Sequence, residues 1–277
     1  MALDLPVFYK RTASAIVFAI VMLVGLLTNS WAFLALISAI QILCFRDYFH
    51  LMIKIAPDTY WPKYLKIFVQ TISLLWLWSA SVMYSYQFPW PAFVCAPACL
   101  LVVTVMSKKD AWQAGLQSLT GMVYIMLPML LLSQMHTICI LIPIAVIVMI
   151  WTSDTMAYLV GSFIGKTPFS PVSPKKSWEG IIGGAILTIV AGGIWGYYSH
   201  YYNIIDWMVL ALIISIAGPL GDLVESKLKR MANVKDSGNL MPGHGGALDR
   251  FDSLLIAVPF TFCYAWFFMP SIIVKLF

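Results

Sequence analysis

The chain has 277 residues, of which 61% are hydrophobic and only 10% are charged, and its formal net charge is +5. Soluble domains are about one-quarter charged, so this composition excludes an ordinary water-soluble enzyme, and the apolar content excludes a disordered chain. At about 20 apolar residues per crossing, the chain has room for roughly eight to ten transmembrane helices. We therefore expect an all-α polytopic membrane protein.

Nine apolar runs follow one another along the chain and predict nine transmembrane helices. They cover residues 13–28, 31–45, 65–84, 90–106, 115–133, 136–151, 180–198, 207–222 and 253–270. The first run follows Lys10 and Arg11, as in a signal peptide, but residues 28–30 lack a convincing cleavage site and another apolar run follows at once. We expect this run to stay as the first helix of a single integral membrane domain over residues 1–277.

The basic residues predict the orientation of these helices. If nine helices alternate from a cytoplasmic N-terminus, every lysine and arginine except Lys275 falls on the cytoplasmic side, as the positive-inside rule requires. One helix more or fewer before the last loops would scatter these charges to both sides. We therefore expect the N-terminus in the cytoplasm and the C-terminus outside.

All five cysteines lie inside apolar runs, without a Cys-x-x-Cys pair. They are Cys44, Cys95, Cys99, Cys139 and Cys263. An odd number of thiols within lipid-spanning helices argues against a disulfide framework or a zinc site. We interpret them as small apolar packing residues.

The segment from residue 221 to residue 253 holds an unusual concentration of charge. Asp222, Glu225, Ser226 and Lys229 follow the i, i+3, i+4, i+7 spacing, so they share one face of a helix that continues the eighth apolar run. A loop rich in glycine and proline follows. Beyond it, acidic residues three positions apart mark the entry to the last helix.

Such a segment suits a metal-bound polyphosphate. Mg²⁺ prefers oxygen ligands, usually one or two carboxylates together with substrate phosphate and water. Lysine and arginine neutralise phosphate charge, and glycines let backbone N–H groups approach it. The alternative is a solvated basic loop in which Asp249 and Asp252 only stabilise the N-terminus of the last helix.

A second polar cluster covers residues 153–180, where we expect a loop after the sixth apolar run. Asp154 stands near a helix end in apolar surroundings and is a functional candidate, because a carboxylate is costly to desolvate there. It could equally be an interfacial carboxylate that reaches water. Ser173 to Glu179 could simply cap the next helix, and Trp178 is a normal interfacial anchor.

Together these residues resemble the signature of the phosphatidate cytidylyltransferases, which are also called CDP-diacylglycerol synthases. The first shared element consists of Ser226-x-x-Lys229-Arg230, Lys235-Asp236 and Pro242-x-His244-Gly245-Gly246-x-x-Asp249-Arg250-x-Asp252. The others are Ser-Pro-Lys-Lys-Ser-x-Glu-Gly at 173–180 and Asp-x-x-Ala-Tyr at 154–158. The resemblance covers about residues 152–253, the expected catalytic region, whereas residues 1–150 match only in hydropathy. Met241 and Ala247 depart from the usual pattern, but both are apolar and neither would supply a ligand.

The resemblance implies transfer of the cytidylyl group of CTP to phosphatidate, with diphosphate released and Mg²⁺ required. It assigns the metal to Asp222 and Asp249, with Glu225 and Asp252 as second choices, and leaves a second cation, divalent or monovalent, open. The remaining catalytic candidates, which would bind phosphate, are Lys229, Arg230, Lys235 and Arg250. Candidate substrate-binding residues are Lys175, Lys176, Ser177, Ser226, Asp154, His244, Gly245 and Gly246.

The expected setting follows from the two substrates. Phosphatidate keeps its acyl chains among the membrane lipids while CTP arrives from the cytoplasm, so we expect an active site on the cytoplasmic face of a bacterial plasma (inner) membrane. The resemblance suggests a homodimer and gives no role to nucleic acid.

Three other classes of function compete with this one: a transporter, a structural membrane protein and a different lipid enzyme. A transporter would need ionisable residues near the middle of its helices, and a structural membrane protein would leave the charged segment without a purpose. A CDP-alcohol phosphotransferase would need an Asp-x-x-Asp-Gly helix motif, which the sequence lacks. A polyprenol or other lipid kinase would use the same Mg²⁺, aspartate and lysine chemistry, so the residues alone leave it open.

Overall fold

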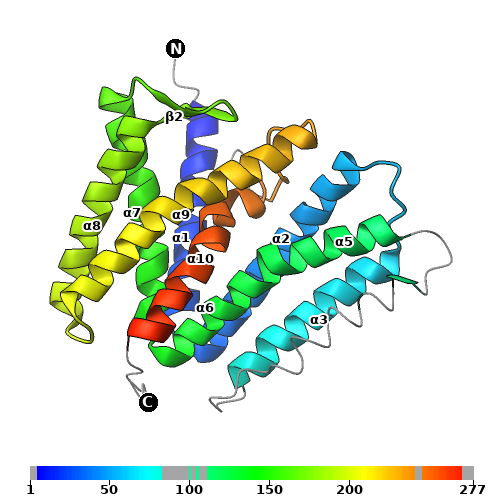
Figure 1. Ribbon diagram of the computed structural model, residues 1–277, viewed down its shortest axis with the longest axis horizontal. Coiled ribbons are helices and arrows are strands. Elements are labelled where there is room, and N and C mark those ends of the chain that lie inside the picture. The colour runs from blue at the N-terminus through cyan, green and yellow to red at the C-terminus, as the bar shows by residue number, and fades with distance from the viewer. Residues whose placement is uncertain (1–4, 83–99, 101–103, 106–110, 241–244, 270–277) are drawn as a thin grey trace. The chain divides into compact units, whose positions relative to one another are not determined.

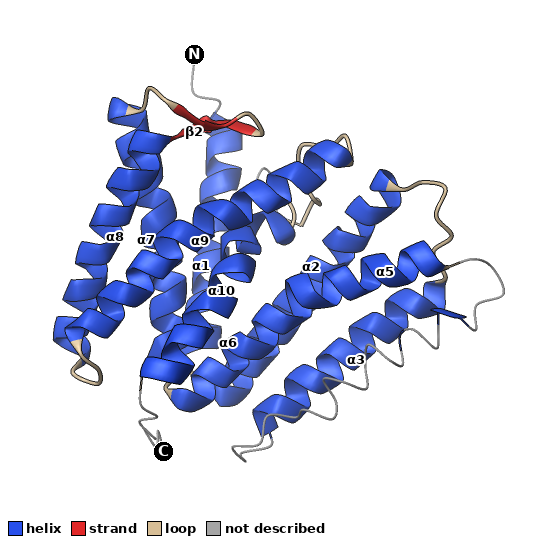
Figure 2. Cartoon of the chain, in the orientation of Figure 1, coloured by secondary structure: helices blue, strands red, loops and turns tan. Residues whose placement is uncertain are grey.

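The structure, a computed structural model, describes residues 5–82, 100, 104–105, 111–240 and 245–269, with side chains from residue 16 onward. The described residues form helices and one short β-hairpin (Figure 2). The chain divides into two compact units. The first comprises Met1–Leu130 and Met231–Phe251, and the second comprises Leu131–Arg230 and Asp252–Phe277.

The first unit is organised around α2, Ser30–Ile55, which contacts every other helix of that unit named here. These neighbours are α1 (Leu5–Leu27), α3 (Lys63–Val82), α5 (Trp112–Gly121) and the π-helical turn η1 (Met122–Met126). The Asn29 side chain caps α2 by accepting a hydrogen bond from the Ala32 N–H at 2.8 Å. α6, Leu127–Ile138, continues from η1 into the second unit.

The π-helical turn is stabilised by a tyrosine of α2. The hydroxyl of Tyr48 donates to the carbonyl oxygen of Gln117 at 2.8 Å and lies 2.6 Å from the hydroxyl of Thr120. A Cβ at Gly121 would come within 2.7 Å of the Tyr48 ring, so only glycine permits this approach. A π-turn frees a carbonyl from the regular helical pattern, and here the buried tyrosine satisfies it.

The second unit contains α7 (Leu141–Ile164), the strands β1 (Pro168–Ser170) and β2 (Ser173–Ser177), α8 (Trp178–Ser199), α9 (Ile204–Met231) and most of α10 (Leu248–Phe268). α7 and α8 run side by side (Figure 1). Their contact is close because α8 has glycine there: a Cβ at Gly184 would meet the Ala157 backbone at 2.8 Å.

The antiparallel β-hairpin joins α7 to α8 across one end of this pair (Figure 2). Ser177 is the N-cap of α8 and accepts from the Gly180 N–H at 3.2 Å. The carboxylate of Glu179 reaches back to the N–H groups of Lys166 and Thr167, both at 3.1 Å. Glu179 therefore ties the start of the hairpin to the first turn of α8. The expected cap within residues 173–179 is confirmed, and Ser177 is the residue that forms it.

Six helices within the described residues are long and apolar enough to cross a membrane, which confirms a helical, multi-spanning protein. They cover Ser30–Ile55, Trp112–Ile138, Leu141–Ile164, Trp178–Ser199, Ile204–Met231 and Leu248–Phe268, and Ile16–Leu27 is a shorter apolar helix. Most of the fourth predicted run, 90–106, lies outside the described residues. Nine crossings and the orientation of the termini stay predictions.

The helices extend well beyond several of the apolar runs, and this corrects the sequence-based boundaries. α2 continues past residue 45, so Arg46 and Asp47 are helical rather than in a loop. α7 continues to Ile164, which places Asp154 inside a helix and not in the loop expected there. Hydropathy marks where a helix is apolar, whereas the backbone hydrogen bonds of a helix continue through polar turns.

Among the cysteines that the structure describes, Cys44 and Cys139 are buried, as expected of packing residues. Cys263 is exposed on α10. Cys95 and Cys99 lie outside the described residues.

Candidate functional site

In the second unit, polar side chains of β2, α9 and α10 are in contact with one another. Lys176 of β2 forms an ion pair with Asp222 of α9. The other oxygen of Asp222, Oδ1, accepts a hydrogen bond from the buried hydroxyl of Ser253 on α10 at 2.9 Å. The fold thus brings Lys176 and Asp222 together, although they lie 46 positions apart in the sequence (222 − 176).

Two further carboxylates act on the same ammonium group. Partial burial lowers the pKa of Lys176, while the negative charges of Asp154 on α7 and Asp252 on α10 oppose that shift. Lys229, which carries a like charge, adds a smaller lowering of this pKa. The surroundings of Lys176 therefore combine three carboxylates with two cations, an arrangement that suits polyvalent ions of either sign.

The expected polar face of α9 is confirmed. Lys229 forms an ion pair with Glu225, one helical turn earlier, and Glu225 is fully buried. Arg230, one position further on, is exposed. The helix therefore holds Lys229 within the polar cluster and leaves Arg230 accessible from outside.

Lys175 and Lys176 point to different surroundings because successive residues of a strand face opposite sides. Lys176 is half-buried in the carboxylate cluster, whereas Lys175 is exposed. From the sequence, we expected both lysines to bind substrate. The strand, which sequence reasoning did not predict, separates them.

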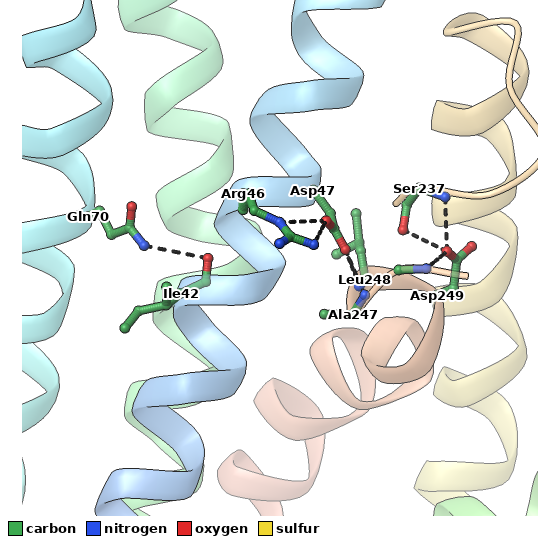
Figure 3. A network of polar contacts seen from close by, with 9 residues as sticks. Ile42, Arg46, Asp47, Gln70, Ser237, Ala247, Leu248 and Asp249 are labelled. Carbon is green, nitrogen blue, oxygen red and sulfur yellow. Dashed lines mark hydrogen bonds and ion pairs between the residues drawn. The ribbon is translucent and has the colours of Figure 1, made fainter. Parts of the chain in front are cut away.

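In the first unit, Asp249 closes a loop at the start of α10 (Figure 3). Its Oδ2 accepts hydrogen bonds from the N–H of Ser237 at 2.9 Å, from the Ser237 hydroxyl at 2.7 Å and from the N–H of Gly246 at 2.7 Å. Three donors occupy the acceptor capacity of that oxygen. Asp249 therefore has a structural task in addition to any role in chemistry.

A carboxylate of α2 that the sequence analysis did not single out binds the same loop (Figure 3). Asp47, which is only 2% exposed, accepts from the N–H of Ala247 at 2.6 Å and from the N–H of Leu248 at 3.4 Å. Its other oxygen lies 3.3 Å from the guanidinium of Arg46. Asp47 thereby holds the beginning of α10.

The remaining predicted residues have simpler positions. Ser226 is half-buried on α9, Gly245 has a left-handed backbone with φ +85°, and Lys235 and Arg250 are exposed. Ser177, expected to bind substrate, uses its hydroxyl as the cap of α8. His244 lies outside the described residues.

The donor chemistry of these carboxylates suits Mg²⁺. No group of three or more His, Cys, Asp or Glu side chains in the described part of the chain is arranged to hold a metal ion by itself. Mg²⁺ ordinarily takes one or two protein carboxylates and fills its other positions with substrate phosphate and water. Asp222, which pairs with Lys176, and Asp154 and Asp252, whose charges act on the same lysine, offer hard oxygen donors of that kind.

Asp47, Ser237 and Ser253 are the polar residues that sequence reasoning missed. Asp47 offered one signal, since it is a carboxylate within a predominantly apolar stretch of the chain. Ser237 and Ser253 are each adjacent to an acidic residue of the resemblance motif, but their burial depends on how the helices pack.

Comparison with known proteins adds independent information. A family model described as the cytidylyltransferase family matches residues 9–268. A phosphatidate cytidylyltransferase of Haemophilus influenzae is 45% identical over 130 residues, which are 45% of this chain and 45% of the relative. One of Bacillus subtilis is 46% identical over 117 residues, 42% of this chain and 44% of the relative. One of Synechocystis is 40% identical over 132 residues, 47% of this chain and 45% of the relative. Each alignment thus spans less than half the length of the curated relative.

Proposed function

The chain belongs to the cytidylyltransferase family, and from that membership we propose that it makes CDP-diacylglycerol and diphosphate from CTP and phosphatidate, in phospholipid biosynthesis. The similarity to proteins named phosphatidate cytidylyltransferase supports this choice of lipid substrate. In the reaction, a phosphate oxygen of phosphatidate forms a bond to the α-phosphorus of CTP. The bond between that phosphorus and the bridging oxygen of the diphosphate breaks, and diphosphate leaves with the electron pair.

Family membership carries the proposal, and within the structure it is supported by the contact between Lys176 and Asp222 among other carboxylates. Both substrates are anionic, and more negative charge develops on the leaving diphosphate. The site must therefore place cationic groups close to the phosphate groups of both substrates. Lys176 is positioned to offset phosphate charge. The attacking phosphate is already ionised, so no residue needs to act as a general base.

The proposed ligands of Mg²⁺ are Asp222 and Asp249, the residues at which the resemblance places the cation site. Because Oδ2 of Asp249 already accepts three hydrogen bonds, its Oδ1 is the atom that we assign to the metal. Glu225 and Asp252 are further candidates, and a second cation, divalent or monovalent, is part of the proposal. Bound Mg²⁺ would offset the charge of the triphosphate and orient its oxygens.

The other cations would bind phosphate groups from the cytoplasmic side. Arg230, Lys235 and Arg250 are exposed and suit this role, and arginine can contact a phosphate with two parallel hydrogen bonds. Lys229, Ser226 and the backbone of Gly245 and Gly246 are the remaining candidates. Lys175 is exposed on the face of β2 opposite Lys176, so the proposal gives it no contact with phosphate.

The proposed location is a bacterial plasma membrane, with the active site facing the cytoplasm and the chain acting as a homodimer. The basic residues support this orientation, because all but Lys275 fall on the cytoplasmic side of a nine-helix topology. Phosphatidate stays in the bilayer and CTP in the cytoplasm. A site at the ends of transmembrane helices would meet both.

The proposal is tested by measuring diphosphate release from CTP by the purified protein in detergent. Release should require phosphatidate and Mg²⁺, and Asp222→Asn and Asp249→Asn should each lower it by about 100-fold or more. Asp58→Asn, which changes an exposed carboxylate, is the matched control and should stay near the wild-type rate. Release that ignores phosphatidate would refute the proposed function. Wild-type rates in both aspartate variants would refute only the metal assignment.

A further inference from the structure

Asp47 is a buried carboxylate in a membrane-spanning helix, and the proposed reaction gives it no role. Such residues are costly in an apolar environment, so they are usually paired and usually functional. The question is therefore what Asp47 holds in place.

Its partners are backbone N–H groups at the start of α10, which lie 200 and 201 residues away in the sequence. The first N–H groups of a helix have no partner within the helix, and its N-terminus carries partial positive charge. A buried carboxylate can accept hydrogen bonds from these N–H groups, and its negative charge offsets the partial positive charge. Asp47 thus fixes the point at which α10 begins.

Glycines bring the loop into direct contact with this carboxylate. A Cβ at Gly238 would lie 2.5 Å from Oδ1 of Asp47, and a Cβ at Gly246 would contact Oδ2. The same added Cβ at Gly246 would also come within 2.5 Å of the Ser237 hydroxyl. Any larger side chain at Gly238 or Gly246 would push the loop away from Asp47.

Two carboxylates, those of Asp47 and Asp249, therefore accept hydrogen bonds from the same loop and helix start (Figure 3). Asp47 holds Ala247 and Leu248, while Asp249 holds Ser237 and Gly246. We call these five residues of the loop and helix start, Ser237, Gly238, Gly246, Ala247 and Leu248, the clasp. Asp249 and Arg250 directly follow the clasp on α10.

We propose that Asp47 is a positioning residue for the reaction: by anchoring the clasp, it sets the position of Asp249 and Arg250 at the start of α10. This inference rests on the proposed function, in which those two residues bind metal and phosphate. Asp47 itself touches neither substrate.

The ion pair with Arg46 does not account for the burial of the Asp47 carboxylate as well as the hydrogen bonds to α10 do. The Arg46 side chain is 53% exposed, and exposed ion pairs contribute little. The short hydrogen bond at 2.6 Å runs to Ala247, not to Arg46.

The test compares Asp47→Ala, Asp47→Asn and the control Asp58→Asn by two measurements, hydrogen–deuterium exchange and steady-state kinetics in detergent. Exchange at residues 245–249 should become about tenfold faster or more in Asp47→Ala, because a hydrogen bond to a charged acceptor is lost. The kcat should fall by about 100-fold while both KM values change by less than about threefold, since a displaced catalytic group affects the chemical step. Asp47→Asn should be intermediate in both, because its amide oxygen can still accept from Ala247.

Three outcomes would overturn the inference. Unchanged exchange in Asp47→Ala would mean that Asp47 does not hold the clasp. Faster exchange with an unchanged kcat would make the clasp structural only, and equally faster exchange in α7 and α8 would indicate general loss of stability. An inactive wild type would instead refute the proposed function, and the exchange data would still report on the clasp.

Discussion

Lys175 and Lys176 are sequence neighbours with the same charge, yet β2 gives them different surroundings. Lys176 pairs with Asp222, whereas Lys175 is exposed. We expect Lys176→Gln to lower kcat/KM by about 100-fold or more, as the loss of one group that stabilises developing charge does. Lys175→Gln, the matched control, should stay within about threefold of the wild type, because Lys175 lies on the face of β2 opposite Lys176 and its carboxylate cluster. Diphosphate release measured at saturating phosphatidate compares the two, and equal losses would contradict the strand geometry.

At the scale of single residues, the sequence predicted the members of a recognisable motif. It missed residues whose role depends on contacts with distant parts of the chain. The spacing of Asp222, Glu225 and Lys229 on one helical face needs nothing beyond the helical repeat. The hydrogen bond from Ala247 to Asp47 joins residues 200 positions apart, and no local pattern encodes it. Burial of Ser237 and Ser253 likewise depends on neighbouring elements.

Among the elements, α8 depends on glycine for its contact with α7. A Cβ at Gly184 would meet backbone atoms of Ala157 at 2.8 Å, and backbone cannot move as a flexible side chain can. We expect Gly184→Ala to lower stability by about 1–3 kcal/mol, the usual cost of overpacking. Gly193 lies on the same helix, and its added Cβ would make only ordinary contact with Met208 at 3.7 Å.

Gly193→Ala is therefore the control for that prediction. It should leave stability unchanged or raise it slightly, because alanine is favoured over glycine within helices. Thermal unfolding of both variants in the same detergent makes the comparison. A Gly184→Ala variant as stable as Gly193→Ala would mean that α7 and α8 are not as close as the structure has them.

Hydropathy located most of the described helices but not their ends. The runs 31–45, 136–151 and 207–222 correspond to α2, α7 and α9, which continue to Ile55, Ile164 and Met231. These extensions contain the charged residues, so an apolar pattern could not include them. The hairpin was missed for a related reason: residues 168–177 contain prolines and lysines, which strands disfavour. Ser177 and Glu179 compensate by tying its ends to α8.

At the scale of the whole molecule, composition alone separates a membrane protein from a soluble one, and the charge distribution predicts its orientation. Six candidate spans lie within the described residues, and sixteen of the 17 basic residues, all but Lys275, fall on one side of the predicted topology. That side also carries the carboxylates around Lys176 and, by the same count, the start of α10 with Asp249. The basic residues alone predict only the orientation, and the functional candidates are the carboxylates that share this side with them.

The central claim is that the cytidylyl group, not a terminal phosphate, moves to the lipid. The most direct measurement gives the purified protein phosphatidate and CTP labelled with radioactive phosphorus at either the α or the γ position. We predict that only the α label enters the lipid fraction and that the γ label leaves as diphosphate. Entry of the γ label into a lipid would contradict the account and identify a lipid kinase instead.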